Sequence, residues 1–429
     1  MTIIQRVYAR EVLDSRGKPT VEAEVHLSGG AMGSAIVPSG ASTGSAEACE
    51  LRDEDPAYYD GQGTLLAVKN VNHLLGPAIV GMRAEEQMSL DERLIEIDGT
   101  PNKSQLGANA ILAVSLAAAQ AAAVAWQVPL FRYLNGHYNT VAQKLSRGSF
   151  VSVAPRMPLP MTNMISGGKH AGGNLDFQDI LVMPHAASHY AVGLEWIVRI
   201  YRRLGTLLNR AGYEGYLVGD EGGYGPRLPG NREAVEFVVR AIELAGLKPG
   251  EQVSIAIDVA ASHFYRDGAY QLAAEQGKKL TSSEMVDRLE QWMNAFPITS
   301  IEDGLAEEDW NGWQELTKRL GGRAHIVGDD LFATNPQRIN KGRDLQAANA
   351  VLIKMNQIGT LSETLEAVAL TKRAGFAAVV SARSGESEDT FMSDLAVAVA
   401  ADRIKIGSIA RSERLAKYNR LLRIGEMLR

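Results

Sequence analysis

The run ITSIEDG at residues 298–304 is followed by HIVGDDL at 325–331 and then by AVLIKMNQ at 350–357. Each run is a short apolar segment that ends in charged or polar residues, as buried strands of α/β proteins often do. Glu302 and Asp329 are 27 residues apart, and Asp329 and Lys354 are 25 apart, so each interval has room for one crossover helix. The stretch therefore predicts successive strand–helix units with parallel strands.

The same pattern continues on both sides of this stretch. Arg383 follows Lys354 after 29 residues, and Lys405 follows Arg383 after 22, so each residue returns to the same end of the sheet. The other strand-like runs are DFQDILVMP (176–184), YLVGDEGG (216–223), VSIAIDVAAS (253–262), AAVVSARSG (377–385) and DRIKIG (402–407). Helical patterns over 232–246, 282–295 and 361–375 lie between runs. A parallel α/β barrel is favoured, although a doubly wound sheet would also give alternating units.

The N-terminal third has a different organisation. Strand-like segments at 3–14, 20–27 and 33–38 are separated by glycine and proline clusters, which is typical of a short antiparallel meander. Helical patterns follow from about residue 46 to residue 124, including LLAVKNVNHLL at 65–75. We expect an α+β capping domain over residues 1–138 and a catalytic barrel domain over 139–429, with the proline-rich APRMPLP (154–160) just after the boundary.

Bulk properties narrow the functional classes. A chain of 429 residues is long enough for a large barrel and a smaller domain, and its net charge of −6 gives no sign of nucleic-acid binding. Cys49 is the only cysteine, so no intrachain disulfide can form. The apolar stretch 108–126 is alanine-rich and contains polar residues, and the charged N-terminus does not resemble a signal peptide. We expect a cytoplasmic protein that does not bind membranes.

Three acidic residues stand at the ends of successive predicted strands: Asp258, Glu302 and Asp329. Carboxylates that converge at one point cannot all stay ionised without compensation, and a divalent cation is the usual compensation. Oxygen-only ligands favour Mg²⁺ over zinc. The alternative for each acid is that it caps a loop or pairs with a nearby base. The three together predict a metal site.

Basic and acidic side chains complete the predicted site. Lys354 follows three apolar residues, so burial is expected to lower its pKa toward that of a general base, although it could instead be a structural counter-ion. Glu221, in the GDEGG loop, is a candidate partner acid. Arg383, Ser384 and Lys405 would form a basic, hydroxyl-lined edge suited to phosphate and carboxylate groups, although each could be a surface residue.

Two glycine-rich loops are candidate lids. PSGASTG (38–44) offers hydroxyls and backbone amides that could fold over an anion, but it could equally be an ordinary linker. GGKHAGG (167–173) places His170 between glycines, which would let the histidine move as a lid closes. The sequence contains no GxGxxG, Walker-type loop or HExxH, so nucleotide-binding and zinc-protease functions have no support.

Taken in order, several motifs resemble the enolase family over essentially the full length. They are PSGASTG, GDEGG, DVAAS, SIEDG, VGDDL, LIKMNQIGTLSET, RSGESEDT and IKIGSIARSERLAKYN. The resemblance implies an eight-stranded α/β barrel of the TIM type whose early strands depart from the parallel order. It also implies an N-terminal α+β cap and a homodimer or larger assembly.

The resemblance also implies the metal chemistry. Asp258, Glu302 and Asp329 are similar to the ligands of a tightly bound Mg²⁺, and Ser42 to the lid residue that binds a second Mg²⁺ arriving with the substrate. Lys354 resembles the base that removes the proton next to the substrate carboxylate. Because that proton is hardly acidic, two Mg²⁺ ions are needed to stabilise the resulting dianion.

The substrate contacts are implied in the same way, for a small phosphorylated or phosphono three-carbon acid. Glu221 resembles the acid that helps the 3-hydroxyl leave, and Lys405 the residue that binds the substrate carboxylate. Arg383 and Ser384 would hold the phosphate, and His170 would close over the substrate.

Two positions depart from the family pattern. The family has Gln-Glu after the histidine loop, where this chain has Gln178 and Asp179, the former expected to contact substrate and the latter to take part in catalysis. The family has a histidine before the arginine of SHRSG, where this chain has Ala382. Asp179 retracts a carboxylate by about 1.5 Å, and Ala382 removes an imidazole. Both changes fall around Glu221, where water would leave.

Three functions are therefore weighed. The favoured one is a diverged paralogue with enolate chemistry, such as carboxyphosphonoenolpyruvate synthase of phosphonate antibiotic pathways. The second is a conventional enolase that dehydrates 2-phosphoglycerate to phosphoenolpyruvate. The third is a non-catalytic binding or structural protein, which the three acids around one point argue against. A member similar to mandelate racemase is disfavoured by PSGASTG and RSGESEDT.

Overall fold

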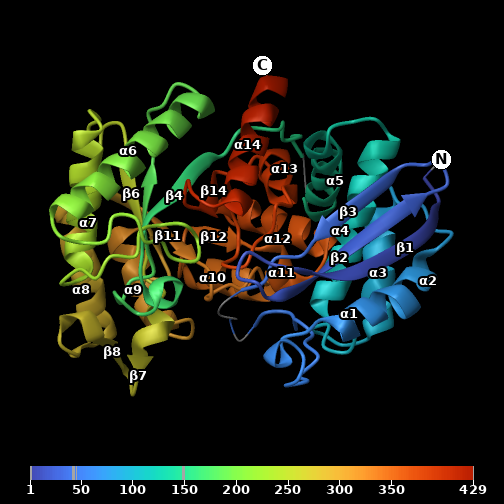
Figure 1. Cartoon of the computed structure of the whole chain (residues 1–429), viewed down its shortest axis with the longest axis horizontal. Coiled ribbons are helices and arrows are strands. Elements are labelled where there is room, and N and C mark those ends of the chain that lie inside the picture. Colours follow the sequence, from blue (N-terminus) through green and yellow to red (C-terminus); the bar gives the residue numbers. More distant parts are fainter. Residues whose placement is uncertain (1, 41–43, 45, 147–149, 429) are drawn as a thin grey trace.

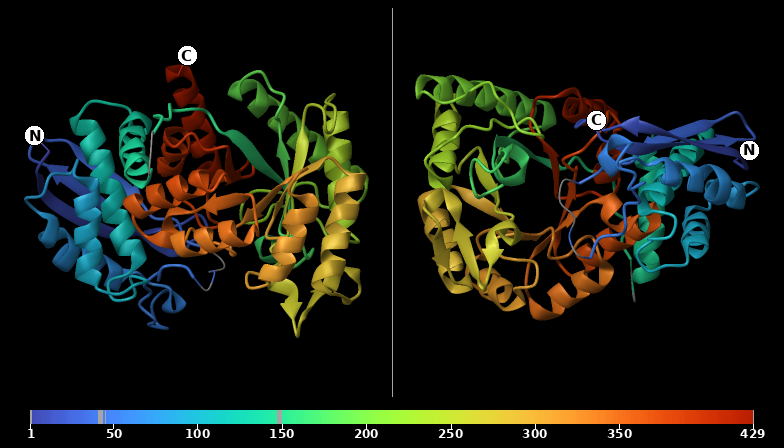
Figure 2. Two further views of the ribbon diagram at one scale, coloured as in Figure 1. Left: turned by 180° about the vertical axis from the view of Figure 1, so that it is seen from behind. Right: turned by 60° about the horizontal axis from the view of Figure 1, so that its bottom comes forward.

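The computed structural model describes residues 2–40, 44, 46–146 and 150–428. The chain forms an N-terminal α+β part beside an α/β barrel (Figures 1 and 2). The N-terminal part begins with the antiparallel sheet β1-β2-β3, made of β1 (Ile4–Leu13), β2 (Pro19–Leu27) and β3 (Met32–Ile36). The predicted meander is confirmed.

One alanine-rich helix covers this sheet. Helix α4 (Ala108–Ala125) packs on β2 and β3, and Gly33 of β3 approaches its backbone so closely that an added Cβ would lie 2.4 Å from the carbonyl oxygen of Ala117. Among the described residues α4 is the one helix that is long and apolar enough to cross a membrane. However, 83% of this helix is buried inside the protein. Its composition is explained by this close packing against the sheet.

The predicted helical region is only partly helical. Residues 46–64 contain a single short 3-10 turn (Tyr59–Gly61), so the prediction of helix from residue 46 is wrong there. Asp53 turns its carboxylate to the backbone amides of Leu65 and Leu66 at the start of α1 (Leu65–Asn70). An aspartate whose carboxylate accepts hydrogen bonds from backbone amides stabilises the start of a helix and is unfavourable within one. The helical run then continues through a π-helical turn (Val71–Leu75) into α2 (Gly76–Ile79).

Eight strands close into a barrel, in the order β10-β11-β12-β13-β14-β4-β5-β6. They are β4 (Leu159–Ser166), β5 (Asp179–Met183), β6 (Ser254–Asp258), β10 (Ile298–Glu302), β11 (His325–Gly328), β12 (Ala350–Ile353), β13 (Ala377–Ser381) and β14 (Arg403–Gly407). All neighbours pair in parallel except that β5 is antiparallel to both β4 and β6. The predicted barrel and its departure from parallel order are confirmed.

One predicted strand is wrong and one barrel strand was missed. The run YLVGDEGG (216–223) forms a glycine-rich loop with only an isolated bridge between Val218 and Tyr224. The missed barrel strand is β4, which lies between β14 and β5 and begins within the proline-rich APRMPLP segment. Prolines at 158 and 160 mask the strand pattern, because proline is read as a strand breaker. Pro160 is tolerated at the beginning of the strand.

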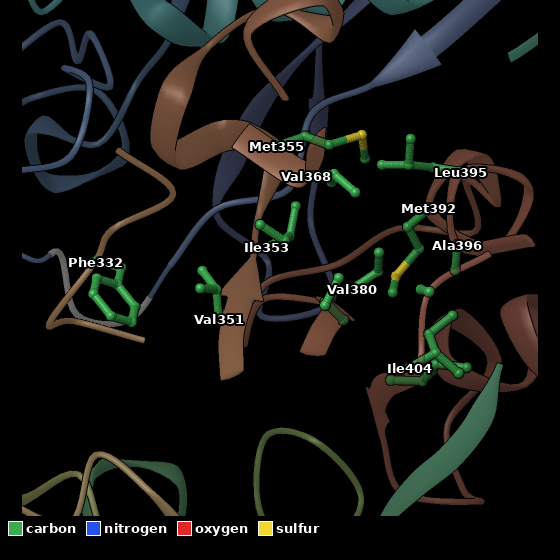
Figure 3. Packing of buried hydrophobic residues seen from close by; sticks show 14 of the residues in the cluster. Phe332, Val351, Ile353, Met355, Val368, Val380, Met392, Leu395, Ala396 and Ile404 are labelled. Carbon is green, nitrogen blue, oxygen red and sulfur yellow. The ribbon is translucent and has the colours of Figure 1, made fainter. Parts of the chain in front are cut away.

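Alternating side chains along barrel strands such as β5, β6 and β12 separate two cores. Val351 and Ile353 of β12 belong to the large core between the barrel strands and surrounding helices, whereas Leu352 belongs to a small core inside the barrel. Figure 3 shows Val351, Ile353 and, on β13, Val380 among side chains that come from the covering helices. Since successive side chains of a strand point to opposite faces, Lys354 is the next position on the inward side of β12.

The remaining elements connect the strands or cover them. The helices are α3 (Gln87–Asp98), α5 (Leu130–Leu145), α6 (Tyr190–Arg210), α7 (Asn231–Leu244), α8 (Ser282–Ala295), α9 (Trp310–Leu320), α10 (Pro336–Leu345), α11 (Met355–Ile358), α12 (Leu361–Arg373), α13 (Phe391–Ala398) and α14 (Ser412–Met427). A small sheet comprises β7 (Tyr265–Arg266), β8 (Ala269–Leu272) and β9 (Lys278–Leu280). Short 3-10 turns lie at 168–171, 261–264 and 273–275. The predicted boundary after residue 138 falls within α5, which packs against α12 and α13 of the barrel, and it stays a prediction.

Candidate active site

A polar pocket lies at the end of the barrel where the parallel strands finish. About 490 Å³ between its lining side chains is not filled by atoms, a figure that includes open solvent at its mouth. The residues predicted from sequence that line it are His170, Gln178, Glu221, Asp258, Asp329, Lys354, Arg383, Ser384 and Lys405. Glu302 and Asp179 contact these residues, whereas Ser42 lies outside the described residues.

The reversed strand β5 explains how Asp179 joins the site. Asp179 begins β5, whereas Asp258 ends β6, yet the two residues pair directly in the antiparallel register. A strand that runs against its neighbours begins at the end where they finish, so its first residue faces the same pocket. The alternation also places Leu181 of β5 and Ala256 of β6 inside the barrel, below these two acids.

The three predicted metal ligands are buried and are held by lysines. Nζ of Lys405 donates to Asp258 Oδ2 at 2.7 Å and to the Glu302 oxygens at 2.8 and 2.9 Å. Nζ of Lys354 donates to Asp329 Oδ2 at 2.5 Å. Two ammonium groups therefore offset three carboxylates, and the oxygens of this trio do not all lie within 4.8 Å of one another. The carboxylates are oriented by ammonium partners in this arrangement.

The pKa of Lys354 differs from the sequence-based expectation. Burial is the largest effect and lowers it, but the nearby carboxylates, Asp329 foremost and Glu302 with it, together outweigh burial, so the pKa of Lys354 lies above its ordinary value. The expectation of a lowered pKa is therefore wrong for this ligand-free arrangement, because a carboxylate that accepts a hydrogen bond from the ammonium group stabilises its charged form. In the same way the carboxylates of Asp258 and Glu302 outweigh the burial of Lys405 and raise its pKa well above the ordinary value.

The donor set fits a hard divalent cation. All candidate ligand atoms of the trio are carboxylate oxygens, which suits Mg²⁺. A second acidic group lies beside them, since oxygens of Asp303, Asp329 and Asp330 lie within 4.8 Å of one another. Asp303 accepts hydrogen bonds from the backbone amides of Asp329 and Asp330 at 2.9 and 2.8 Å, and it thereby fixes the loop that carries Asp329. The carboxylates of Asp303, Asp329 and Asp330 are close enough together to hold a divalent cation, whereas Asp258 and Glu302 are drawn to Lys405.

A histidine–carboxylate cluster forms another wall of the pocket. His170 Nδ1 lies 3.1 Å from Asp179 Oδ2, and its Nε2 lies 3.9 Å from Glu221 Oε1. Asp179 is fully buried, and its other oxygen accepts a hydrogen bond from Asn163. Burial raises the pKa of Asp179 to about 6, with His170 opposing this rise. The cluster can hold and transfer a proton.

Ala382 itself contributes no titratable group to the pocket. It follows β13, lines the pocket and presents only a methyl group, while its backbone amide donates to the Lys405 carbonyl at 2.8 Å. Gln178 lies across the barrel mouth and donates from Nε2 to Asp258 Oδ2 at 3.1 Å. Its buried Oε1 has no hydrogen-bond partner among the described residues, so it can accept from a ligand hydroxyl.

The basic edge is built from both parts of the chain. Arg383 forms a two-point ion pair with Glu47, at 3.0 and 3.3 Å, and its Nη1 also donates to Asn356. Ser384 accepts a hydrogen bond from Arg16 at 3.2 Å. Glu47 and Arg16 both come from the N-terminal part, so this part contributes to the pocket edge.

Several of these residues were not found from the sequence. Asp303 follows Glu302 directly and could have been suspected from the acidic pair, and Asp330 follows Asp329 in the same way. Glu47 and Asn163 carry no such signal, because their contacts join segments that are distant in sequence. His263 also lines the pocket, and burial lowers its pKa to about 4.

Comparison with known families agrees with this geometry. A family model described as "Enolase, N-terminal domain" matches residues 4–134, and one described as "Enolase, C-terminal TIM barrel domain" matches residues 154–429. The chain belongs to the enolase family. The resemblance seen in its motifs is thus confirmed, together with the enolase-type barrel and the N-terminal domain beside it.

Proposed function

We propose that this enolase-family protein is a Mg²⁺-dependent, lyase-type enzyme that removes the proton next to the carboxylate of a phosphorylated three-carbon acid, with Lys354 as the base. The observation that carries the proposal is the position of two groups on the closed barrel. β12, which precedes Lys354, and β5, which begins with Asp179, are four strands apart in an eight-stranded ring. A substrate between them would meet a base on one face and the His170–Asp179–Glu221 cluster on the other.

The other residues take roles that their contacts support. Lys354 would take the proton at Nζ, and Glu221 with His170 would supply a proton to a departing group on the opposite face. Lys405 would bind the substrate carboxylate, and Arg383 with Ser384 would bind the phosphate. Asp258, Glu302 and Asp329 would hold Mg²⁺, which when bound stabilises the negative charge that develops on the substrate carboxylate. Ser42 is proposed for a second Mg²⁺.

The altered wall favours a reaction other than simple dehydration. Asp179 uses one oxygen for Asn163 and the other for His170, and Ala382 offers no proton. A diverged enzyme such as a carboxyphosphonoenolpyruvate synthase, which handles a bulkier phosphono group, is therefore the best candidate. Conventional dehydration of 2-phosphoglycerate is the second candidate, and it is favoured by the close approach of His170 to Glu221.

The first experiment mixes purified protein, Mg²⁺ and 2-phosphoglycerate and follows the absorbance of phosphoenolpyruvate. About ten turnovers per second, a typical enzyme rate, would identify a conventional enolase despite both changes. A negligible rate with retained Mg²⁺ binding would support the diverged reaction, and phosphonate co-substrates would be tested next. Failure to bind Mg²⁺ in calorimetry would instead favour a non-catalytic role. A homodimer or larger homo-oligomer in the cytoplasm, without nucleic-acid or membrane binding, stays a prediction.

A further inference from the structure

We infer that Arg16, from the loop between β1 and β2, is a positioning residue of the phosphate subsite that turns the Ser384 hydroxyl toward an anionic ligand. The inference rests on the proposed function, because it takes Arg383 and Ser384 as the groups that bind phosphate. It adds a residue of the N-terminal part to a subsite otherwise made by the loop after β13.

The contacts of Arg16 hold its guanidinium in one place. Nη1 donates to Ser384 Oγ at 3.2 Å, while Nε and Nη2 donate to Asp14 Oδ2 at 3.2 and 3.0 Å. Nη2 also donates to the Ser39 carbonyl at 3.1 Å. The side chain is only 10% exposed, so these bonds are shielded from water. A charged donor fixed by several acceptors loses little additional entropy when it orients a neighbour.

The chemistry of the pair sets the direction of the Ser384 hydroxyl. A guanidinium has only donors, so Ser384 Oγ must accept from Arg16, and the hydroxyl hydrogen must point elsewhere. Ser384 is 5% exposed and lines the pocket. Within the described residues its hydroxyl donates to no other group. A buried donor directed into a pocket beside an arginine suits a phosphate oxygen.

Backbone contacts hold both the loop between β1 and β2 and the segment after β3 against the loop after β13. Ser39 and Gly385 exchange two hydrogen bonds of 2.9 Å, and the Ser15 amide donates to the Glu386 carbonyl at 2.7 Å. Gly385 has no room for a side chain, since an added Cβ would lie 2.1 Å from Asp14 Oδ2. The β1–β2 loop and the segment after β3 therefore pack on the loop after β13, and this packing holds Arg16 beside Ser384.

The test is a double-mutant cycle on 2-phosphoglycerate binding, measured by calorimetry with Mg²⁺. Arg16→Met should weaken binding about tenfold, as expected for loss of a charge-assisted contact. In a Ser384→Ala background the same substitution should change binding less than about twofold, because the group it orients is gone. Arg16→Lys, which keeps a donor, should recover part of the affinity. Arg10→Met is the matched control, since Arg10 pairs with Glu22 and Glu24 on β2 of the same sheet.

If Arg16→Met weakens binding equally with Ser384 present and in the Ser384→Ala background, the inference is overturned. Arg16 would then act only through its charge or through the stability of the fold. Unchanged binding by Arg16→Met would overturn it as well. Failure of the unsubstituted protein to bind 2-phosphoglycerate would overturn the proposed function, and this inference with it. Normal binding by the unsubstituted protein together with equal losses in both backgrounds would overturn this inference alone. Urea unfolding of each variant shows whether weaker binding accompanies a loss of unfolding free energy, as a loosened loop would give, or occurs without one. If Arg16→Met is unstable, Arg16→Lys is compared with the unsubstituted protein instead.

Discussion

His170 and Asp179 form a buried pair, with Nδ1 of the imidazole 3.1 Å from Oδ2 of the carboxylate. Burial lowers the pKa of His170, but the charges of Asp179 and Glu221 outweigh it and raise this pKa to about 9. The imidazole is therefore a cation at neutral pH in the ligand-free protein. Its partner carboxylate sits on the reversed strand, so the pair depends on the topology of the barrel.

This pair predicts a pH dependence of stability. Because the folded pKa of His170 lies above its ordinary value of 6.5, its stabilisation is fully present below about pH 6.5 and is lost as the pH rises through about 9. Urea unfolding of metal-free protein should show stability falling over this window. The fall should be smaller in His170→Asn, and Asp179→Asn should reduce it too. Equal slopes in all three proteins would contradict a raised pKa.

Lys354 is expected to control proton removal. Lys354→Met should slow exchange of the substrate proton next to the carboxylate by about 10²–10⁴-fold, the range for loss of a general base. The measurement is incorporation of deuterium into 2-phosphoglycerate in D₂O, which reports the first step even if no product forms. Lys248→Met is the control, since Lys248 is an exposed lysine that pairs with Glu251. Exchange that persists in Lys354→Met would assign the base elsewhere.

Lys405 should matter most when metal is absent. Its single ammonium group pairs with both Asp258 and Glu302 in a buried site, so Lys405→Met leaves the two carboxyl groups without their common partner. We expect a loss of about 3–5 kcal/mol of unfolding free energy without metal. Saturating Mg²⁺ should recover much of this loss, because the cation replaces the missing charge. Denaturation with EDTA and with Mg²⁺ checks this, and a loss that Mg²⁺ does not reduce would argue against a metal at these acids.

Gly33 provides a test of the N-terminal packing. Gly33→Ala would bring a methyl group within 2.2 Å of the Ala121 amide nitrogen on α4, so the helix must move away from the sheet. Overpacking of this kind costs about 1–3 kcal/mol, measurable by urea unfolding. Gly136→Ala is the control, because an added Cβ there meets nothing within 4 Å and alanine favours a helix. Similar stability of the two variants would show that the β3–α4 contact is adaptable.

Much of the barrel follows from sequence patterns. In runs such as VSIAIDVAAS and HIVGDDL, alternate side chains point to the surrounding helices and to the barrel interior. The prediction that the acids stand at the ends of these strands is therefore correct. The strand β4 was missed because prolines interrupt its beginning. The loop 216–223 was mistaken for a strand because its apolar residues are also consecutive, and only the pairing of β4 and β5 excludes it from the barrel.

The candidate site was less predictable where it joins distant segments. The pairs Glu47–Arg383 and Arg16–Ser384 span 336 and 368 residues, and no local spacing links them. Likewise the sequence shows that Lys354 follows a buried strand, but not that Asp329 bonds to its ammonium group. The first two contacts depend on how the N-terminal part packs on the barrel. The contact between Asp329 and Lys354 depends on which buried charges lie close enough to pair.

Restoring the two altered groups should test what the pocket wall decides. Ala382→His with Asp179→Glu should raise dehydration of 2-phosphoglycerate, followed by phosphoenolpyruvate absorbance, by about 10² or more if these positions set the reaction. The longer glutamate side chain would extend the carboxylate by about 1.5 Å toward the pocket, and the introduced histidine would supply an imidazole next to Arg383. Both single variants, and Mg²⁺ titration of each protein, show whether the gain needs both groups and leaves the metal site intact. An unchanged rate with normal Mg²⁺ binding would place the determinant of specificity outside Asp179 and Ala382, and the neighbouring lining residue His263 would then be the next position to exchange.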